Sequence, residues 1–353
     1  MNKNTKGSYY ESGEVVFGIQ SPGPGWIRLD GSTQKVSPKI LSKLTTVVWN
    51  TQTSNFSNLV YSVAYGTNTW VAVGFGGALR TSTDNAVTWN TQTSQFGSST
   101  ILSVVYDNGI WVAGGVSGTL RTSTDAINWN TQVSNFSNLV DIKAIAYGNG
   151  TWVAAGGSTT LRTSTNNGVT WNTQTSNFDL TAFSIAYGNG VWVAVSFSGT
   201  LRTSTDAINW TTRTSNFGFS NIFAVSYGNG VWVAGGAGGA LRTSTDNAVT
   251  WNTQTSTFGT FEIYSVAYGN GIWVAGGQTS GAPGTLRTST DAINWNTQVS
   301  NFSTVVTVNA LAYGNGTWVA GGDNGSIRTS GNSQTFATPL VNPAYSIYGW
   351  MKL

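Results

Sequence analysis

The chain contains no cysteine and no histidine among its 353 residues. Without cysteine it can form no disulfide bond and no thiolate metal site. Without histidine it lacks the commonest metal ligand and the commonest general base. We therefore expect no bound metal and no cofactor.

Charge is also scarce, since only 8% of the residues are charged, against about 25% in ordinary soluble proteins. The surface must consist largely of Ser, Thr, Asn, Gln and Gly. Such a surface cannot neutralise many phosphates, so we expect no nucleic-acid partner despite the formal net charge of +3. No apolar run reaches the length of a membrane span and the N-terminus has no signal-peptide core, so we expect no membrane insertion.

Lysine and proline are almost confined to the two ends of the chain. Outside the first 43 residues, only Lys143 and Lys352 are lysines, and Pro283 is the one proline inside the middle region. This composition predicts three parts: an N-terminal module over residues 1–45, a central domain over residues 46–338, and a C-terminal tail over residues 339–353 that packs near the N-terminal module.

The central region repeats one phrase seven times, and each copy contains Trp-Val-Ala. The repeated tryptophans are Trp70, Trp111, Trp152, Trp192, Trp232, Trp273 and Trp318, spaced 41, 41, 40, 40, 41 and 45 residues apart. A strand-rich repeat of about 40 residues is typical of a β-propeller blade. The sequence therefore predicts an all-β fold, a seven-bladed β-propeller.

Each repeat divides into four expected strands separated by Gly- and Asn-rich turns. In the first repeat they are Tyr61–Tyr65, Thr69–Val73, Ala78–Ser82 and Thr88–Thr93.

Outer strands are in excess, because Trp49–Phe56 copies Trp171–Phe178 although no repeat precedes it. A propeller must close its last blade, and Trp49–Thr53 is predicted to do so in the blade that contains Trp318. Gln334–Thr338 is the alternative closing strand.

A second motif, Ser-Thr-Asp-Asn-Ala-Val-Thr-Trp at positions 82–89, resembles the Asp-box of sialidase-type (BNR) propellers. Long and short forms alternate along the chain, which indicates duplication of a two-blade unit. The resemblance implies a folded turn in which the acid accepts backbone N–H bonds and the tryptophan packs between blades. The residues assigned this structural role are Asp84, Asp125, Asn166, Asp206, Asp246 and Asp291.

The arginines argue against catalysis. A sialidase needs an arginine triad at non-equivalent positions, whereas here one arginine recurs at one equivalent position of each repeat: Arg80, Arg121, Arg162, Arg202, Arg242, Arg287 and Arg328. We expect each to bond carbonyl groups or to stack on a tryptophan. The repeats also resemble the photosystem II assembly propellers, but likeness of fold carries no function. We expect no enzyme activity.

The N-terminal phrase Pro-Gly-Trp-Ile-Arg-Leu-Asp-Gly-Ser, residues 24–32, resembles the opening of phage tail-fibre and tail-collar modules. Leu29 stands where that family usually has cysteine. The C-terminal Gly349–Leu353 mirrors Gly25–Leu29, which predicts that the two phrases pair. The resemblance implies attachment to other phage tail proteins through residues 1–45 and the C-terminal tail.

Comparison of the seven repeats separates positions that are the same in every copy from positions that differ between copies. The loops that join one blade to the next vary most, and they share a face opposite the Tyr-Gly-Asn-Gly turns and the acidic motifs. Loops on a rigid scaffold commonly bind ligands, and exposed aromatic side chains suit stacking on sugar rings. The ligand-binding candidates, expected off the sevenfold axis, are Phe183, Phe219, Phe223, Phe261, Glu262, Tyr264 and Gln278 with its loop to Gly284. Neutral drift is the alternative.

The sequence thus predicts a non-catalytic phage tail protein that binds a host-surface glycan or receptor. We expect it in the virion, made in the host cytoplasm, as a homo-oligomer or in multiple copies. The alternatives are a cellular propeller scaffold or assembly factor with a protein partner, and a purely structural virion component.

Overall fold

The computed structural model describes residues 49–157, 161–174, 181–278, 284–302 and 306–331, together with the backbone of five short strands nearer the chain ends. The chain divides into two compact units, residues 1–46 with 332–353 and residues 47–331.

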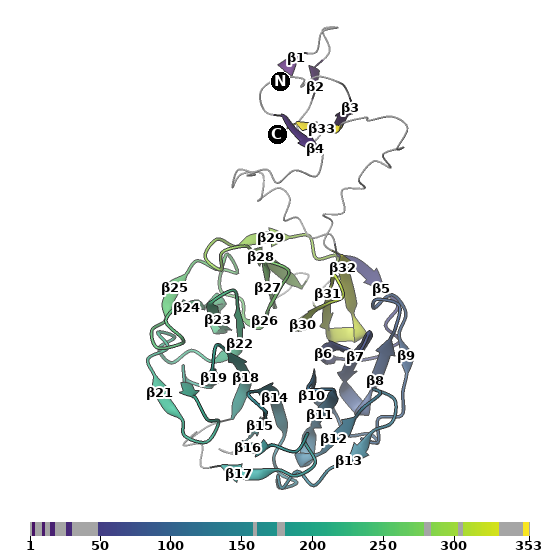
Figure 1. Ribbon diagram of the computed structural model, residues 1–353, viewed down its shortest axis with the longest axis vertical. Coiled ribbons are helices and arrows are strands. Elements are labelled where there is room, and N and C mark those ends of the chain that lie inside the picture. The colour runs from purple at the N-terminus through teal and green to yellow at the C-terminus, as the bar shows by residue number, and fades with distance from the viewer. Residues whose placement is uncertain are drawn as a thin grey trace. The chain divides into compact units, whose positions relative to one another are not determined.

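The larger unit is built of seven four-stranded antiparallel sheets placed around a central axis (Figure 1). The predicted fold class, an all-β seven-bladed propeller, is confirmed. We number the blades 1 to 7 in the chain order of their inner strands.

The strands of the seven blades recur at equivalent positions. The inner strands are β6 (Val60–Gly66), β10 (Ile101–Asp107), β14 (Ile142–Gly148), β18 (Ala182–Gly188), β22 (Ile222–Gly228), β26 (Ile263–Gly269) and β30 (Val308–Gly314). The second strands are β7 (Thr69–Gly74), β11 (Ile110–Gly115), β15 (Thr151–Gly156), β19 (Val191–Ser196), β23 (Val231–Gly236), β27 (Ile272–Gly277) and β31 (Thr317–Gly322). The third strands are β8 (Leu79–Ser82), β12 (Leu120–Ser123), β16 (Leu161–Ser164), β20 (Leu201–Ser204), β24 (Leu241–Ser244), β28 (Thr285–Ser289) and β32 (Ile327–Gly331). The outer strands are β9 (Asn90–Thr91), β13 (Asn130–Thr131), β17 (Asn172–Gln174), β21 (Thr211–Arg213), β25 (Asn252–Gln254), β29 (Asn296–Gln298) and β5 (Asn50–Gln52). Within the described residues, short 3-10 turns follow four second strands: η1 (Phe75–Gly77), η2 (Val116–Gly118), η3 (Ala237–Gly239) and η4 (Asp323–Gly325).

The first outer strand begins later than predicted, at Asn90 rather than Thr88. The reason is local, because the Thr88 N–H donates to the Asp84 carboxylate instead of to the neighbouring strand. Thr88 therefore belongs to the turn.

The ring closes as predicted, with β5 as the outer strand of blade 7. Thr51 is paired with Arg328 and Gln52 with Ile327 in the antiparallel register. Figure 1 shows this N-terminal purple strand beside the yellow β32. The alternative closing strand, Gln334–Thr338, lies outside the described residues.

The core consists of seven hydrophobic clusters, each formed where two neighbouring blades meet. At the join of blades 7 and 1, Trp70 and Trp89 pack with Val319 and Ile327. Both tryptophans are almost fully buried. An aromatic side chain of this kind buries about 150–250 Å², which corresponds to roughly 4–6 kcal/mol of gross hydrophobic stabilisation. The closing join is therefore packed like the joins within the chain.

A close approach between blades explains the repeated Tyr-Gly pair. A Cβ added to Gly188 would lie 2.2 Å from Cγ of Tyr227 in the next blade. Such an overlap would displace the aromatic ring of Tyr227, so glycine is required at position 188.

In the smaller unit, β1 (Asn2–Lys3) pairs with β2 (Tyr9–Tyr10). The C-terminal strand β33 (Gly349–Lys352) lies between β3 (Val15–Phe17) and β4 (Trp26–Leu29). Trp350 is opposite Arg28 in this sheet. The predicted pairing of the two repeated phrases is therefore present.

Candidate functional site

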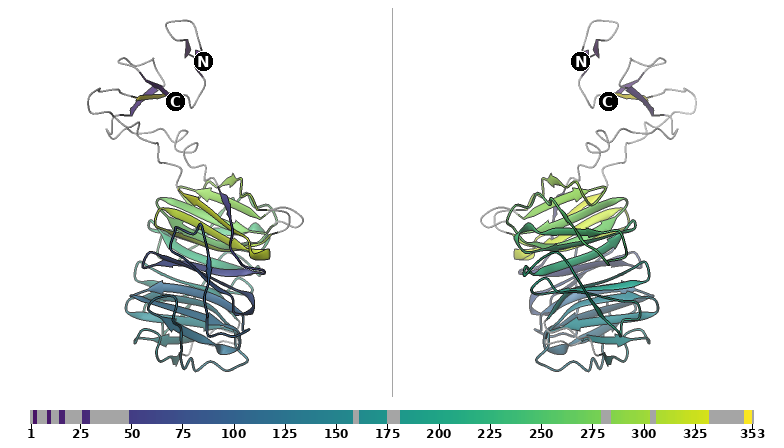
Figure 2. Two further views of the ribbon diagram at one scale, coloured as in Figure 1. Left: turned by 90° about the vertical axis from the view of Figure 1, so that its right-hand side faces the viewer. Right: turned by 90° about the vertical axis from the view of Figure 1, so that its left-hand side faces the viewer.

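The propeller has two faces that differ in their turns, and Figure 2 shows the ring edge-on between them. On one face, the turns between inner and second strands meet the acidic motifs of the next blade. Asn108 donates to Asn167 Oδ1 at 2.9 Å, for example. On the other face, the turns after the second strands bond the loops that join the blades, as where the Phe75 N–H donates to the Leu59 carbonyl at 3.1 Å. The predicted division of turns between the faces is confirmed.

A β-bulge interrupts every inner strand at its second residue. In blade 1, Val60 is opposite Gly74 but Ser62 is already opposite Val73, which leaves Tyr61 unpaired. A bulge re-aims a side chain relative to a regular strand. We call the seven equivalent residues the bulge ring: Tyr61, Leu102, Lys143, Phe183, Phe223, Tyr264 and Asn309.

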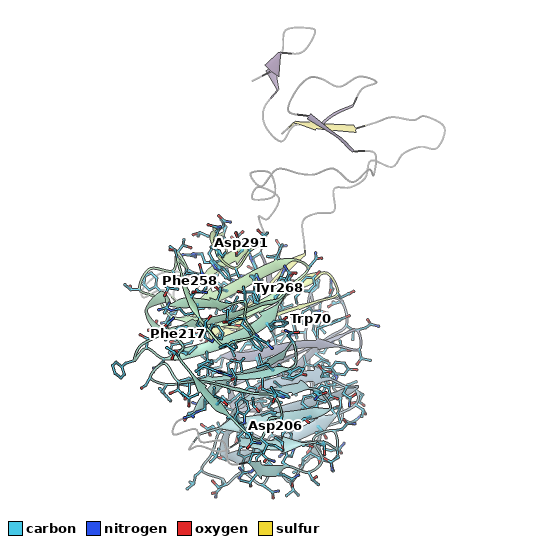
Figure 3. All side chains as sticks on the ribbon, turned by 60° about the vertical axis from the view of Figure 1, so that its left-hand side comes forward. Trp70, Asp206, Phe217, Phe258, Tyr268 and Asp291 are labelled. Carbon is cyan, nitrogen blue, oxygen red and sulfur yellow. The ribbon has the colours of Figure 1, made fainter. Side chains whose placement is uncertain are left out.

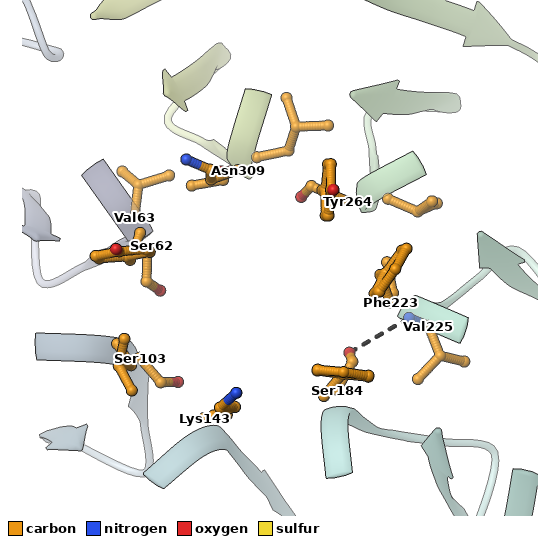
Figure 4. A pocket seen from close by; sticks show the side chains of 17 residues that line it. Ser62, Val63, Ser103, Lys143, Ser184, Phe223, Val225, Tyr264 and Asn309 are labelled. Carbon is orange, nitrogen blue, oxygen red and sulfur yellow. Dashed lines mark hydrogen bonds between the residues drawn. The ribbon is translucent and has the colours of Figure 1, made fainter. Parts of the chain in front are cut away.

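All seven members of the bulge ring line one cavity of about 170 Å³. Every blade contributes to its wall, so the cavity lies on the propeller axis. Figure 4 shows the lining side chains arranged around an open middle.

Residue type varies more at the bulge ring than at neighbouring positions of the inner strand. The ring includes Lys143, Phe183 and Asn309, whereas the next position along the strand is only Ser or Ala in all seven blades. One backbone geometry thus presents cationic, aromatic, aliphatic and amide side chains to one cavity.

Three members form an aromatic arc: Phe183, Phe223 and Tyr264. The Phe183 and Phe223 ring centroids are 5.3 Å apart, and those of Phe223 and Tyr264 are 4.9 Å apart. Phe197 packs behind Phe183 with centroids 4.4 Å apart. At the other end, the Lys143 ammonium lies 5.4 Å from the Phe183 centroid, within the range of a cation–π contact.

The opposite side of the ring is acidic. Asp323 accepts hydrogen bonds from Asn309 Nδ2 and from the Thr307 N–H, both at 3.0 Å. Burial raises the pKa of Tyr264, and the charges of Glu262 and Asp323 raise it further. The Tyr264 phenol therefore remains a neutral hydroxyl at pH 7.

The structure separates the predicted binding residues into two groups. Phe183, Phe223 and Tyr264 come together, but they lie within strands, so their assignment to loops was wrong. They line a cavity to which all seven blades contribute, whereas the off-centre position of a ligand stays a prediction. A bulge inside each strand turns these side chains inward, which alternation along a strand does not reveal.

The remaining candidates do not line the cavity. Phe219 is 95% exposed. Phe261 and Glu262 are half-buried, and the Glu262 carbonyl accepts from the N–H of Gln278 at 3.2 Å. The rest of the predicted loop, residues 279–283, lies outside the described residues.

Sequence reasoning missed four members of the bulge ring: Tyr61, Leu102, Lys143 and Asn309. A signal existed, because aligning the seven repeats shows one variable column inside an otherwise uniform strand.

The acidic turns have the geometry expected of a folded hairpin. Asp84 Oδ1 accepts from the Val87 and Thr88 N–H groups at 3.2 and 2.9 Å, and the Thr88 hydroxyl donates to Oδ2. Burial raises the pKa of Asp84, but these hydrogen bonds outweigh it and hold the pKa at about 2.

Equivalent contacts recur at the other turns. The N–H of the residue three or four positions along donates to the side-chain oxygen of Asp125, Asn166, Asp206, Asp246 and Asp291. Asp206 and Asp291 are labelled in Figure 3.

The repeated arginines bridge neighbouring blades. Arg242 donates from Nε and Nη2 to the Asn216 carbonyl at 3.0 and 2.8 Å, and its Cζ lies 4.8 Å from the centroid of Phe217. The expected carbonyl bonds are present, but the stacking partner is phenylalanine, not tryptophan. The tryptophans are already buried in the clusters between blades, whereas the joining loop brings a phenylalanine to six of the seven arginines. Arg202 donates from Nη1 to the Thr212 hydroxyl at 2.7 Å. Equivalent stacks join Arg80–Phe56, Arg121–Phe96, Arg162–Phe136, Arg287–Phe258 and Arg328–Phe302 (Figure 3 labels Phe217 and Phe258).

Within the described residues, no group of three or more acids is placed to hold a metal ion. In the same part of the chain, no helix is long and apolar enough to cross a membrane.

Comparison with known proteins supports the fold. A family model for the DUF6242 beta propeller domain matches residues 123–263. No curated protein matches the chain significantly in sequence. YCF48 from Cyanidioschyzon merolae is similar with a TM-score of 0.66 at 14% identity, covering 81% of this chain and 99% of that one. The structure of YCF48 bound to D1 peptide has a TM-score of 0.65 at 15% identity, with 80% and 96% covered. The computationally designed Ika8 protein gives 0.57 at 13% identity, with 78% and 97% covered.

Proposed function

We propose that the propeller is a non-catalytic binding module that holds a segment of a protein partner at the bulge ring. The observation that carries this proposal is the variety of side chains at seven equivalent positions around one cavity. A purely structural role requires no such variety, because the adjacent Ser or Ala positions serve the same strands with almost no change.

The size of the cavity favours a side chain over an oligosaccharide. Its volume is about 170 Å³. A cavity of about 150 Å³ holds one benzene molecule, whereas sites for whole small-molecule ligands occupy about 300–1,000 Å³. One apolar side chain of a partner would occupy its aromatic side as an anchor, the arrangement in which a few central residues dominate protein interfaces.

The comparisons support the same class of partner. YCF48 bound to D1 peptide is a structure of similar fold with a peptide as its ligand. At 15% identity the residues of its site are not transferred to this chain.

Attachment to a phage virion is a separate proposal. It rests on the phrase at residues 24–32 and on the pairing of β4 with β33, which joins both ends of the chain in one sheet. Detection of the protein in purified virions, with loss of incorporation on deletion of residues 1–45, would support it.

The binding proposal is tested by selecting peptides from a random display library and screening a glycan array with the same protein. Phe223→Ser removes the centre of the aromatic arc, and Phe219→Ser is the control, since Phe219 is 95% exposed outside the cavity. We expect Phe223→Ser to weaken the selected peptides about tenfold or more, as loss of a central anchor does. Phe219→Ser should leave binding unchanged.

Thermal midpoints of both variants establish that each is folded. Peptides that bind wild type and Phe223→Ser equally would refute the proposal. Ring-dependent binding to glycans alone would also refute it.

A further inference from the structure

We propose that the bulge ring selects an extended partner segment in which an acidic side chain lies two residues away from an apolar side chain. This inference rests on the proposed function and specifies the chemistry of the partner.

Lys143 supplies the recognition of the acid. It is the only lysine between residues 44 and 351, and it belongs to the bulge ring, where the residue type differs most between blades. Within the described residues its ammonium forms no ion pair, and its recorded contact is with the face of Phe183. An ammonium has three hydrogen-bond donors, so these donors are available to a carboxylate from a partner. In Figure 4 the Lys143 nitrogen is turned towards the middle of the ring.

The aromatic arc supplies the recognition of the apolar group. It runs from Phe183 past Phe223 to Tyr264 with centroid separations of 5.3 and 4.9 Å. The wall is therefore continuous from the lysine across three blades. An apolar side chain entering the cavity would be covered by this wall.

Charge determines the orientation of the segment. Asp323 accepts from Asn309 Nδ2 at 3.0 Å in blade 7, and its charge acts on the phenols of Tyr264 and Tyr61 on either side. Glu262, two residues before Tyr264, acts on the Tyr264 phenol as well. A carboxylate is repelled from that side of the ring and attracted to Lys143 on the other. The acid of the partner must therefore lie at blade 3 and its apolar group towards blades 5 and 6.

The spacing follows from strand geometry. In an extended peptide, neighbouring side chains point to opposite sides, while residues i and i+2 point to the same side about 6.5–7 Å apart. An acid beside Lys143 then places the side chain at i+2 on the aromatic arc, since the Phe183 centroid is 5.4 Å from the Lys143 ammonium and 5.3 Å from the Phe223 centroid. Adjacent acidic and apolar residues would direct one of the two away from the ring.

The test uses three labelled peptides with blocked termini, measured by fluorescence anisotropy. The first is Gly-Ser-Glu-Ser-Phe-Ser-Gly, the second has Gln in place of Glu, and the third has Glu and Phe adjacent. Wild type should bind the first about tenfold more tightly than either of the others, the size expected for one hydrogen bond to a charged group. Lys143→Met should abolish this preference, and Lys143→Arg should retain it.

Equal binding of the Glu and Gln peptides, or an equal effect of Lys143→Met on both, would overturn the inference. Equal binding of the adjacent-residue peptide would overturn the spacing. If none of the three binds while library peptides bind through Phe223, the inference fails and the proposed function stands. If library peptides also fail, both fall. Displacement by N-acetylneuraminic acid that depends on Lys143 would assign the lysine to an acidic sugar and contradict the inference.

Discussion

The arginine–phenylalanine contact between blades should contribute measurably to stability, and Arg242→Ala tests it. The Arg242 guanidinium donates twice to the Asn216 carbonyl and once to its neighbour Leu241, at 3.0 Å. It also covers Phe217, which is almost fully buried. Truncation of Arg242 would remove the hydrogen bonds between the joining loop and β24, and it would expose the aromatic ring of Phe217 to solvent.

The magnitude follows from these contacts. A hydrogen bond to a charged group contributes about 1.5–3 kcal/mol, and a cation–π contact at a partly exposed site adds about 0.5–1 kcal/mol. The Arg242 guanidinium is only partly buried, so water replaces some of the hydrogen bonding that the variant loses. The expected loss is therefore roughly 2–3 kcal/mol, which lowers the melting temperature by roughly 3–5 °C in a domain of this size.

Urea and thermal unfolding at pH 7 provide the assay, with two further variants as controls. Arg121→Ala should cost the same as Arg242→Ala, because Arg121 donates to the Gln95 carbonyl and stacks on Phe96 in the same way. Arg213→Ala should cost less, about 1.5 kcal/mol, the lower end for a hydrogen bond to a charged group, because Arg213 donates to the Thr203 hydroxyl at 2.8 Å without the two bonds to a loop carbonyl that Arg242 makes. A difference above about 1 kcal/mol between Arg121→Ala and Arg242→Ala would refute the reasoning, since equivalent contacts should contribute equally to stability.

Two further predictions concern ring closure and acid stability. Trp49→Ala should lower the free energy of unfolding in urea by about 3–5 kcal/mol. Trp171→Ala should have the same effect, because both side chains are fully buried at equivalent positions. A much smaller loss for Trp49→Ala would show that β5 is not needed to close the ring. Hydrogen bonds from Thr250 hold the pKa of Asp246 at about 2, below about 3.9 in an unfolded chain. A depressed pKa stabilises the fold above the unfolded value, and this stabilisation is lost as the pH falls from about 4 to about 2. Asp246→Asn should therefore flatten the decline of the urea midpoint over that range, and an unchanged slope would count against it.

The repeat architecture could be predicted from the amino-acid sequence. Seven Trp-Val-Ala phrases at nearly constant spacing could only be satisfied by seven equivalent units, since each unit buries its tryptophans against a neighbour. The surplus copy at Trp49–Phe56 likewise predicted the closing strand, because an outer strand without its own blade must pair elsewhere. The sequence identity between repeats was sufficient to predict both the seven-bladed fold and the closing strand.

The site depended on the tertiary structure. Lys143 and Asn309, for example, are 166 positions apart in the chain and line the same cavity only because the ring closes. Alternation along a strand predicts which sheet face a side chain occupies, but it does not predict a bulge that turns the second residue of each strand to the axis. The stacking of phenylalanine rather than tryptophan on six of the arginines also depended on the path of the joining loops. Contacts between blades are set by closure, which no single repeat encodes.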